Sequence, residues 1–108
     1  MSLEKLVKMN QLFAFYHKLL TQRQQEMLGL YYQEDYSLGE IANYYDISRQ
    51  AVYDNIRRGE RALEEYEEIL QLNQRRLKRV DLIEKLAPYV TTNEEANKLL
   101  EDLKSMDL

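Results

Sequence analysis

The chain has 108 residues and a formal net charge of −4, with 44% hydrophobic and 31% charged residues. This length favours one domain, residues 1–108, and the composition is that of a folded chain. The absence of cysteine excludes disulfides and thiolate metal sites, and no apolar run approaches the roughly 18 residues of a membrane span. We therefore expect a soluble, cytoplasmic protein.

The pattern of caps and apolar residues predicts an all-α fold, since the chain holds only three glycines and one proline. An amphipathic first helix is expected to end near Leu20. "TQRQ" and "SLGE" are capping boxes, which predict helix starts after Thr21 and Ser37. Ser48 is the next good N-cap residue, and a long helical pattern follows it.

The C-terminal half raises a problem of length. A single helix from Arg49 to Ala87 would be about 58 Å long, which is too long for a compact domain of this size. The apolar stripe shifts phase before "VDLIEKLA", so we expect a break around Leu72-Asn73. Pro88 is expected to stop the helix that precedes it. The capping box "TNEE" predicts a last helix capped by Thr92.

A helix-turn-helix is predicted between Ser37 and Arg61. Such a motif needs a small residue where the helices cross, a turn of three or four residues, and apolar residues that hold the second helix against the first. Ala42 supplies the small residue and "YYDIS" the turn. The clamp residues are Ile41, Ile47, Val52 and Ile56. This core covers about residues 21–61, and a helical extension covers about 62–108.

The second helix of this motif presents a polar, basic surface. Val52 and Ile56 are expected to face inward, with Arg49 and Tyr53 at the flanks. The residues then expected to point outward are Gln50, Asp54, Arg57, Arg58 and Arg61. Hydroxyl, guanidinium and carboxamide groups suit phosphates and base edges. The candidate DNA-contacting residues are Ser48, Arg49, Gln50, Tyr53, Asp54, Arg57, Arg58 and Arg61. The alternative is a solvated face whose arginines are neutralised by Asp54 and Glu60.

Two further charged clusters flank this surface. An acidic tract follows it, which would confine a nucleic-acid contact to the first half of the long helix; a solvated face is the alternative. A second basic cluster could bind phosphates, RNA included, or an acidic partner, or be solvated. The acidic tract is Glu64, Glu65, Glu67 and Glu68, and the basic cluster is Arg75, Arg76, Lys78 and Arg79.

No phosphate-binding loop, nucleophile motif or matched acid–base pair occurs, so we expect no enzyme activity, no cofactor and no metal.

The stretch from "LTQRQQEMLGLYY" to "RRGERALEEYE" resembles region 4 of bacterial sigma factors and its response-regulator relatives. The runs "EDYSLGEIA" and "ISRQAVYDNIRRGE" resemble the YlxM family, and this resemblance covers nearly all 108 residues.

The YlxM resemblance implies an all-α, sigma region 4-like helix-turn-helix bundle with a long fourth helix and additional C-terminal helices. It also implies DNA binding and an association with the signal recognition particle pathway, as a regulator. The DNA-facing positions it implies are Ser48, Arg49, Gln50, Tyr53, Asp54 and Arg57. The turn commonly has glycine where this chain has Asp46, and aspartate tolerates the left-handed conformation better than most residues.

Two hypotheses follow from the sequence. The first is a regulatory protein that inserts the helix after Ser48 into the major groove of duplex DNA. The second is an interaction module that kept this scaffold and binds a protein or ribonucleoprotein of the signal recognition particle pathway. A homodimer is also expected, because the apolar stripe that includes Leu70, Leu77 and Val80 exceeds what a small domain can bury; a hairpin within one chain could cover it instead.

Overall fold

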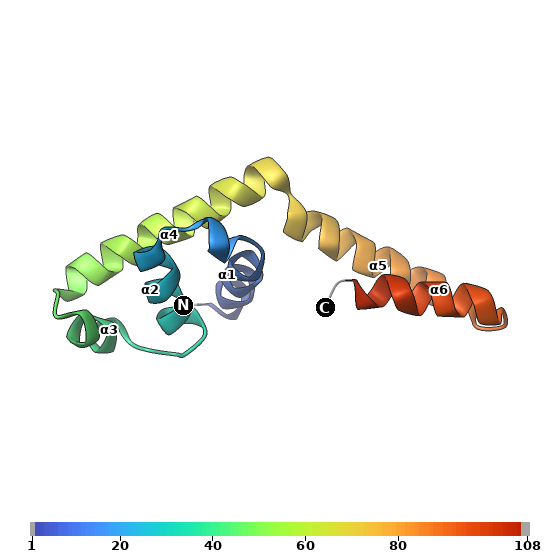
Figure 1. Ribbon diagram of the computed structural model, residues 1–108, viewed down its shortest axis with the longest axis horizontal. Helices are drawn as coiled ribbons and strands as arrows, with labels where there is room; N and C mark the ends of the chain where they lie inside the picture. Colours follow the sequence, from blue (N-terminus) through green and yellow to red (C-terminus); the bar gives the residue numbers. More distant parts are fainter. Residues whose placement is uncertain (1, 107–108) are drawn as a thin grey trace. The chain divides into compact units, whose positions relative to one another are not determined.

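The computed structural model describes residues 2–106, which form six α-helices, one 3₁₀ turn and no strand (Figure 1). The predicted all-α fold is therefore confirmed. The elements are α1 (Leu3–Tyr16), η1 (His17–Leu19), α2 (Gln22–Tyr32), α3 (Leu38–Tyr45), α4 (Arg49–Leu70), α5 (Leu72–Val90) and α6 (Glu94–Ser105). They form two compact units, Met1–Gln71 and Leu72–Leu108. That the two units fold together as one domain stays a prediction.

The first unit is built around α4, which packs against α1, α2 and α3. Its core combines leucine, isoleucine and methionine side chains with two tyrosines and a phenylalanine. The buried residues are Met9, Leu12, Phe13, Tyr16, Leu20, Met27, Leu28, Tyr32, Ile41, Ala42, Val52, Ile56 and Leu63. Because α4 contributes residues from Val52 to Leu63, its first half is fixed in rotation by the core, and its opposite face is left for solvent or a ligand.

The starts of α2, α3 and α4 follow the predicted caps. Thr21 and Gln24 form a reciprocal capping box at 3.1–3.2 Å, and Ser37 and Glu40 form another at 3.1 Å. The hydroxyl of Ser48 accepts a 3.0 Å hydrogen bond from the backbone N–H of Ala51. Each bond satisfies an orphan donor at a helix N-terminus.

The turn between α3 and α4 is a Schellman motif centred on Asp46, which has φ 56° and ψ 51°. The N–H of Ile47 donates to the carbonyl of Ala42 at 3.0 Å, and the N–H of Asp46 donates to that of Asn43 at 3.4 Å. The left-handed aspartate expected from the sequence is confirmed, and the chain reverses directly into the Ser48 cap.

α2 and α4 approach each other closely at Gly59. A Cβ added to Gly59 would lie 2.5 Å from Cδ1 of Leu28, closer than real side-chain contacts allow. Ala42 is also buried, as the helix-turn-helix prediction requires. Ala42 was the small residue predicted from the sequence; the need for glycine at position 59 was not predicted, although a Cβ there would collide with Leu28.

The second unit is a hairpin of α5 and α6, which lie side by side and run in opposite directions (Figure 1). Ile83 and Leu100 are its buried apolar residues. The break before it lies at Gln71, whose φ of 54° ends α4 one residue before the predicted Leu72-Asn73 break. Leu77 remains 47% exposed, so the hairpin covers the predicted apolar stripe only in part.

Two predictions in this hairpin are wrong. Pro88 does not stop α5, which continues to Val90. Pro88 removes the hydrogen bond to the carbonyl of Glu84 and crowds that carbonyl, but it lies in the last turn of α5, where only two residues follow it. The cap of α6 is Asn93, not Thr92: its side chain accepts from the N–H of Ala96 at 3.0 Å. Asparagine caps a helix at least as well as threonine does, and Asn93 directly follows Thr92 in the sequence.

Candidate nucleic-acid interface

The candidate DNA-contacting residues lie on the first half of α4 and at the N-cap before it. Val52 and Ile56 are 0% and 3% exposed, so they fix the inward side of the helix. Six candidate residues are exposed: Ser48, Arg49, Gln50, Tyr53, Arg58 and Arg61. Asp54 and Arg57 are half-buried. All eight therefore retain access to solvent on one segment of a single helix, directly after the turn.

Arg49 lies back over the first turn of α3. A Cβ added to Gly39 would lie 3.0 Å from Nη2 and 3.1 Å from Nε of the Arg49 guanidinium. Gly39 therefore leaves the space that the arginine occupies. This placement joins the first turns of α3 and α4 into one surface, and it agrees with the predicted flanking position of Arg49.

Gln50 and Asp54 form a pair one turn apart on the exposed side. Nε2 of Gln50 donates to Oδ1 of Asp54 at 3.0 Å. This bond orients the carboxamide and keeps its oxygen available as an acceptor. It also gives the Asp54 carboxylate a hydrogen-bond donor on the same exposed side.

Arg57 is tied to a buried carboxylate. Its Nη1 lies 3.4 Å from Oε1 of Glu60, a residue only 3% exposed. Oε2 of Glu60 lies 3.4 Å from Nζ of Lys5 and accepts a hydrogen bond from the Tyr32 hydroxyl. Burial and the bonded carboxylate raise the pKa of Tyr32 far above its ordinary value. Glu60 therefore does neutralise Arg57, but from the core rather than from a solvated face.

This cluster was missed by the sequence analysis. The same helical geometry that puts Val52 and Ile56 inward puts Glu60 one turn beyond Ile56, on the border of the buried side. The helical spacing alone therefore indicated that Glu60 lies at the border of the buried side. The partners Lys5 and Tyr32 come from α1 and α2, and their meeting with Glu60 depends on tertiary packing.

Beyond Arg61, the charge on the exposed side of α4 changes from positive to negative. Arg58 and Arg61 are exposed and make no ion pair with another described residue. Glu64, Glu65 and Glu68 follow them and are also exposed. A phosphate chain would thus meet attraction over the first three turns of α4 and repulsion beyond them.

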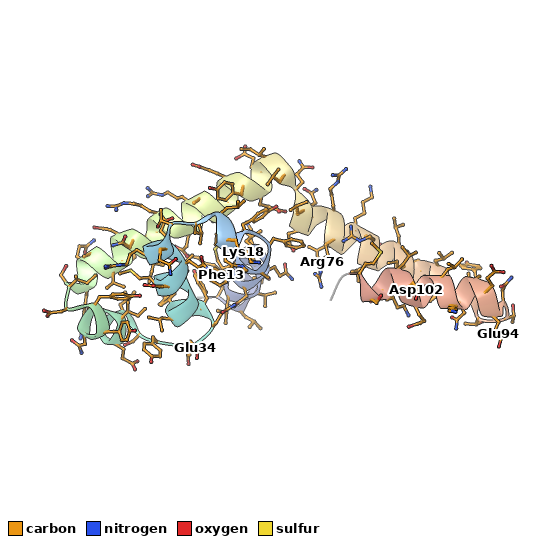
Figure 2. All side chains as sticks on the ribbon, viewed as in Figure 1. Phe13, Lys18, Glu34, Arg76, Glu94 and Asp102 are labelled. Atoms are coloured by element: carbon orange, nitrogen blue, oxygen red, sulfur yellow. The ribbon has the colours of Figure 1, made fainter. Side chains whose placement is uncertain are left out.

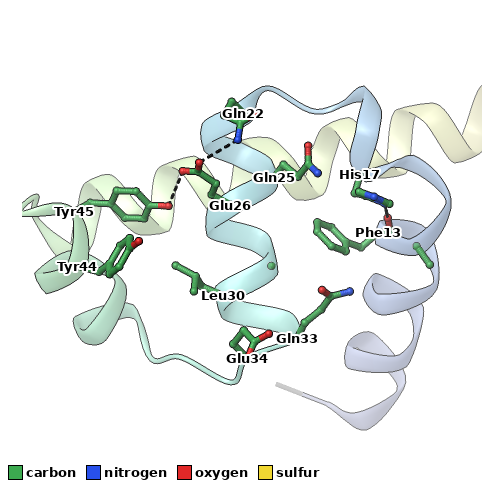
Figure 3. Close-up of a pocket in the computed structure, with 12 residues that line it drawn as sticks. Phe13, His17, Gln22, Gln25, Glu26, Leu30, Gln33, Glu34, Tyr44 and Tyr45 are labelled. Carbon is green, nitrogen blue, oxygen red and sulfur yellow. Dashed lines mark hydrogen bonds between the residues drawn. The ribbon is translucent and has the colours of Figure 1, made fainter.

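An open groove of about 810 Å³ lies between α1, α2 and α3 (Figure 3). Glu26 and Glu34 line it, and Glu26 accepts hydrogen bonds from Gln22 at 3.1 Å and Tyr45 at 2.9 Å. These bonds hold the pKa of Glu26 below its usual value, Gln22 having the larger effect. Because these bonds favour the charged form of Glu26, this groove disfavours phosphates.

Within residues 2–106, no group of three histidine, aspartate or glutamate side chains is arranged to hold a metal ion. Among the helices of that same range, none carries an apolar stretch long enough to cross a bilayer.

Residues 3–103 match the UPF0122 family, described as "Putative helix-turn-helix protein, YlxM / p13 like". A UPF0122 protein of Bacillus pumilus is 49% identical over 110 residues, covering 99% of this chain and 100% of the relative. Relatives from Halalkalibacterium halodurans and Bacillus cereus (strain AH187) are 49% and 50% identical, and each covers 97% of this chain and 99% of its own. The resemblance seen in the sequence is confirmed: the chain belongs to the UPF0122 family of YlxM- and p13-like helix-turn-helix proteins.

Proposed function

We propose that this protein is a regulator that binds duplex DNA, with the first turns of α4 in the major groove. One observation carries the proposal: an exposed, polar and basic half-helix follows a Schellman turn, in a chain whose net charge is −4. An acidic protein has no general attraction for nucleic acid, so a local basic surface on this motif favours a specific contact. The proposal places the protein in the bacterial cytoplasm, where DNA is found.

The proposed contacts divide into base and phosphate readers. The carboxamide of Gln50 would read a base edge, with Asp54 accepting from a cytosine amino group beside it. Ser48 and Tyr53 have hydroxyls that can donate to phosphate oxygens. Arg49, Arg58 and Arg61 would neutralise phosphates, whereas Arg57 contributes less because Glu60 already holds it.

Fluorescence anisotropy titrations on duplexes selected from a random library test this proposal. We expect log affinity to fall against log salt with a slope of about −3, at ~0.9 per neutralised phosphate. Arg61→Ala should reduce that slope by about one and weaken all sequences alike. Lys18→Ala is the matched control, because Lys18 is an exposed cation in η1 rather than in α4. A flat salt dependence would reject phosphate contact.

A second candidate function is favoured by the exposed glutamates. Glu64, Glu65 and Glu68 suit a basic protein surface rather than DNA. In that case the chain would bind a protein or ribonucleoprotein of the signal recognition particle pathway, as the YlxM resemblance implies. Duplex binding would then be absent, and capture of components of that particle from nuclease-treated lysate would depend on these glutamates.

A further inference from the structure

The α5–α6 hairpin leaves large apolar side chains uncovered. Six of them are between 43% and 84% exposed: Leu82, Leu86, Tyr89, Leu99, Leu103 and Met106. They form two stripes with the same spacing of i, i+4 and i+7, one on each helix. Such a spacing lines one side of an α-helix.

The two stripes lie on the same side of the hairpin. At 100° per residue, each stripe is displaced from the buried residue of its helix, Ile83 or Leu100, by about 60–120° in the same rotational sense. In antiparallel helices that face each other, equal displacement in one sense turns both stripes toward one side. We call these six residues the hairpin face. Leu77, displaced in the opposite sense, lies on the other side.

The charges along the hairpin are unevenly divided between its two ends. Residues 72–80 hold four cations and no anion, whereas residues 81–98 hold four carboxylates and two lysines. In Figure 2, Arg76 lies at the beginning of α5 and Glu94 at the opposite end, beside the turn. Asp102 and its neighbours Glu101 and Lys104 lower the positive charge of the first end only by one. The end of the hairpin that holds residues 72–80, which we call its base, is thus positively charged. The opposite end at the turn, which we call its tip, is negatively charged.

We propose that the hairpin face binds a second copy of this chain, with the base of each hairpin over the tip of the other. A twofold axis pairs the same patch on both subunits, and this arrangement brings unlike charges together at both ends. Base-to-base packing would instead bring like charges together. This proposal rests on the second unit alone and does not depend on DNA binding.

The available area suits a weak dimer. α5 has 19 residues and is about 28 Å long, and each helix is about 10 Å wide. α6 has 12 residues and is about 18 Å long, so the two helices together would bury roughly 900 Å² in total over both copies, the size of a weak or transient interface. Burying both hairpin faces would produce a four-helix bundle, the common solution for two amphipathic hairpins.

Sedimentation velocity on the full chain tests the proposal. We expect a mass twice the 13.0 kDa of one chain at micromolar concentration. Leu86→Lys should weaken association by at least about tenfold, because it buries an unpaired charge. Leu77→Lys is the matched control, since Leu77 and Leu86 lie on one helix and are 47% and 46% exposed. A monomeric parent chain, or equal effects of the two variants, would overturn the proposal.

A charge exchange tests the orientation without disturbing the apolar residues. Arg75 and Glu95 are exposed and border the stripes at the base and the tip. Arg75→Glu alone and Glu95→Arg alone should each weaken association several-fold, and an equimolar mixture of the two variants should restore it. Stronger association of Arg75→Glu alone would indicate base-to-base packing and reject the arrangement, as would a mixture no tighter than its components.

Discussion

Nη1 of Arg57 lies 3.4 Å from Oε1 of Glu60, and the two side chains differ sharply in exposure, at 41% and 4%. An arginine on the proposed DNA surface is therefore held from below by a carboxylate of the core. The same carboxylate binds Lys5 and Tyr32, so it links α4 to α1 and α2. This link makes the charge available on the surface depend on a buried residue.

Glu60→Gln should separate the stabilising role of this carboxylate from its effect on the surface. The amide can still accept from Tyr32 but no longer pairs with Lys5 or Arg57, so urea unfolding should show a loss of about 1–2 kcal/mol. Released from Glu60, Arg57 should increase DNA affinity and steepen the salt slope by about one. Glu64→Gln is the control, because it removes the same charge from an exposed site on α4. Equal gains in affinity for both variants would assign the effect to net charge.

Gly59→Ala should destabilise the first unit, because its new Cβ would collide with Leu28 at 2.5 Å. Overpacking of this kind costs about 1–3 kcal/mol. Gly29→Ala is the matched control: its Cβ would meet only Cζ of Phe13, at an ordinary 3.8 Å. We expect that variant to gain about 0.5–1 kcal/mol from helix propensity. Thermal midpoints that move in the same direction for both variants would contradict the close approach at Gly59.

Ala42→Leu should lower the thermal midpoint more than Ala96→Leu. Ala42 is 5% exposed and lies in the core of the helix-turn-helix, where added volume costs about 1–3 kcal/mol. Ala96 is half-buried in the first turn of α6, where a leucine side chain can extend into solvent. Equal midpoints would argue against tight packing of α3 in this motif.

The features that the sequence predicted well are those decided by near neighbours. The caps at Thr21, Ser37 and Ser48 bond to residues three positions away, and the turn at Asp46 depends on its own φ. Local chemistry does not distinguish adjacent candidates, however, so the sequence did not show that Asn93 rather than Thr92 caps α6.

The features that the sequence did not reveal depend on contacts between helices. The burial of Glu60 requires Tyr32, 28 residues earlier, and the need for glycine at position 59 is created by Leu28 on another helix. Periodicity places a residue on the inward side of a helix, but it does not say which residue it meets there. The contacts proposed for Arg58 and Arg61 depend on a ligand, so neither sequence nor fold decides them.

Gln71→Gly should stabilise the chain, because Gln71 has φ 54° at the end of α4. A non-glycine residue in this conformation costs about 1 kcal/mol, which glycine avoids. Glu84→Gly, at an exposed position in the middle of α5, should instead cost about 1 kcal/mol, since glycine weakens a helix interior. Urea unfolding of both variants measures the difference. A loss at both positions would mean that α4 and α5 form a continuous helix in solution.

Gly39→Ala should alter DNA binding without harming the fold. The new Cβ would lie 3.0 Å from the guanidinium of Arg49, the far end of a flexible side chain that can move away, and alanine is the better helix former. We therefore expect an unchanged or higher thermal midpoint and a several-fold weaker specific affinity. A double-mutant cycle with Arg49→Ala shows whether the two residues act together. If the space at Gly39 serves Arg49, then adding Gly39→Ala to Arg49→Ala will cause no further loss. Additive losses would mean that Gly39 affects binding by another route, and the placement of Arg49 over α3 would have no part in recognition.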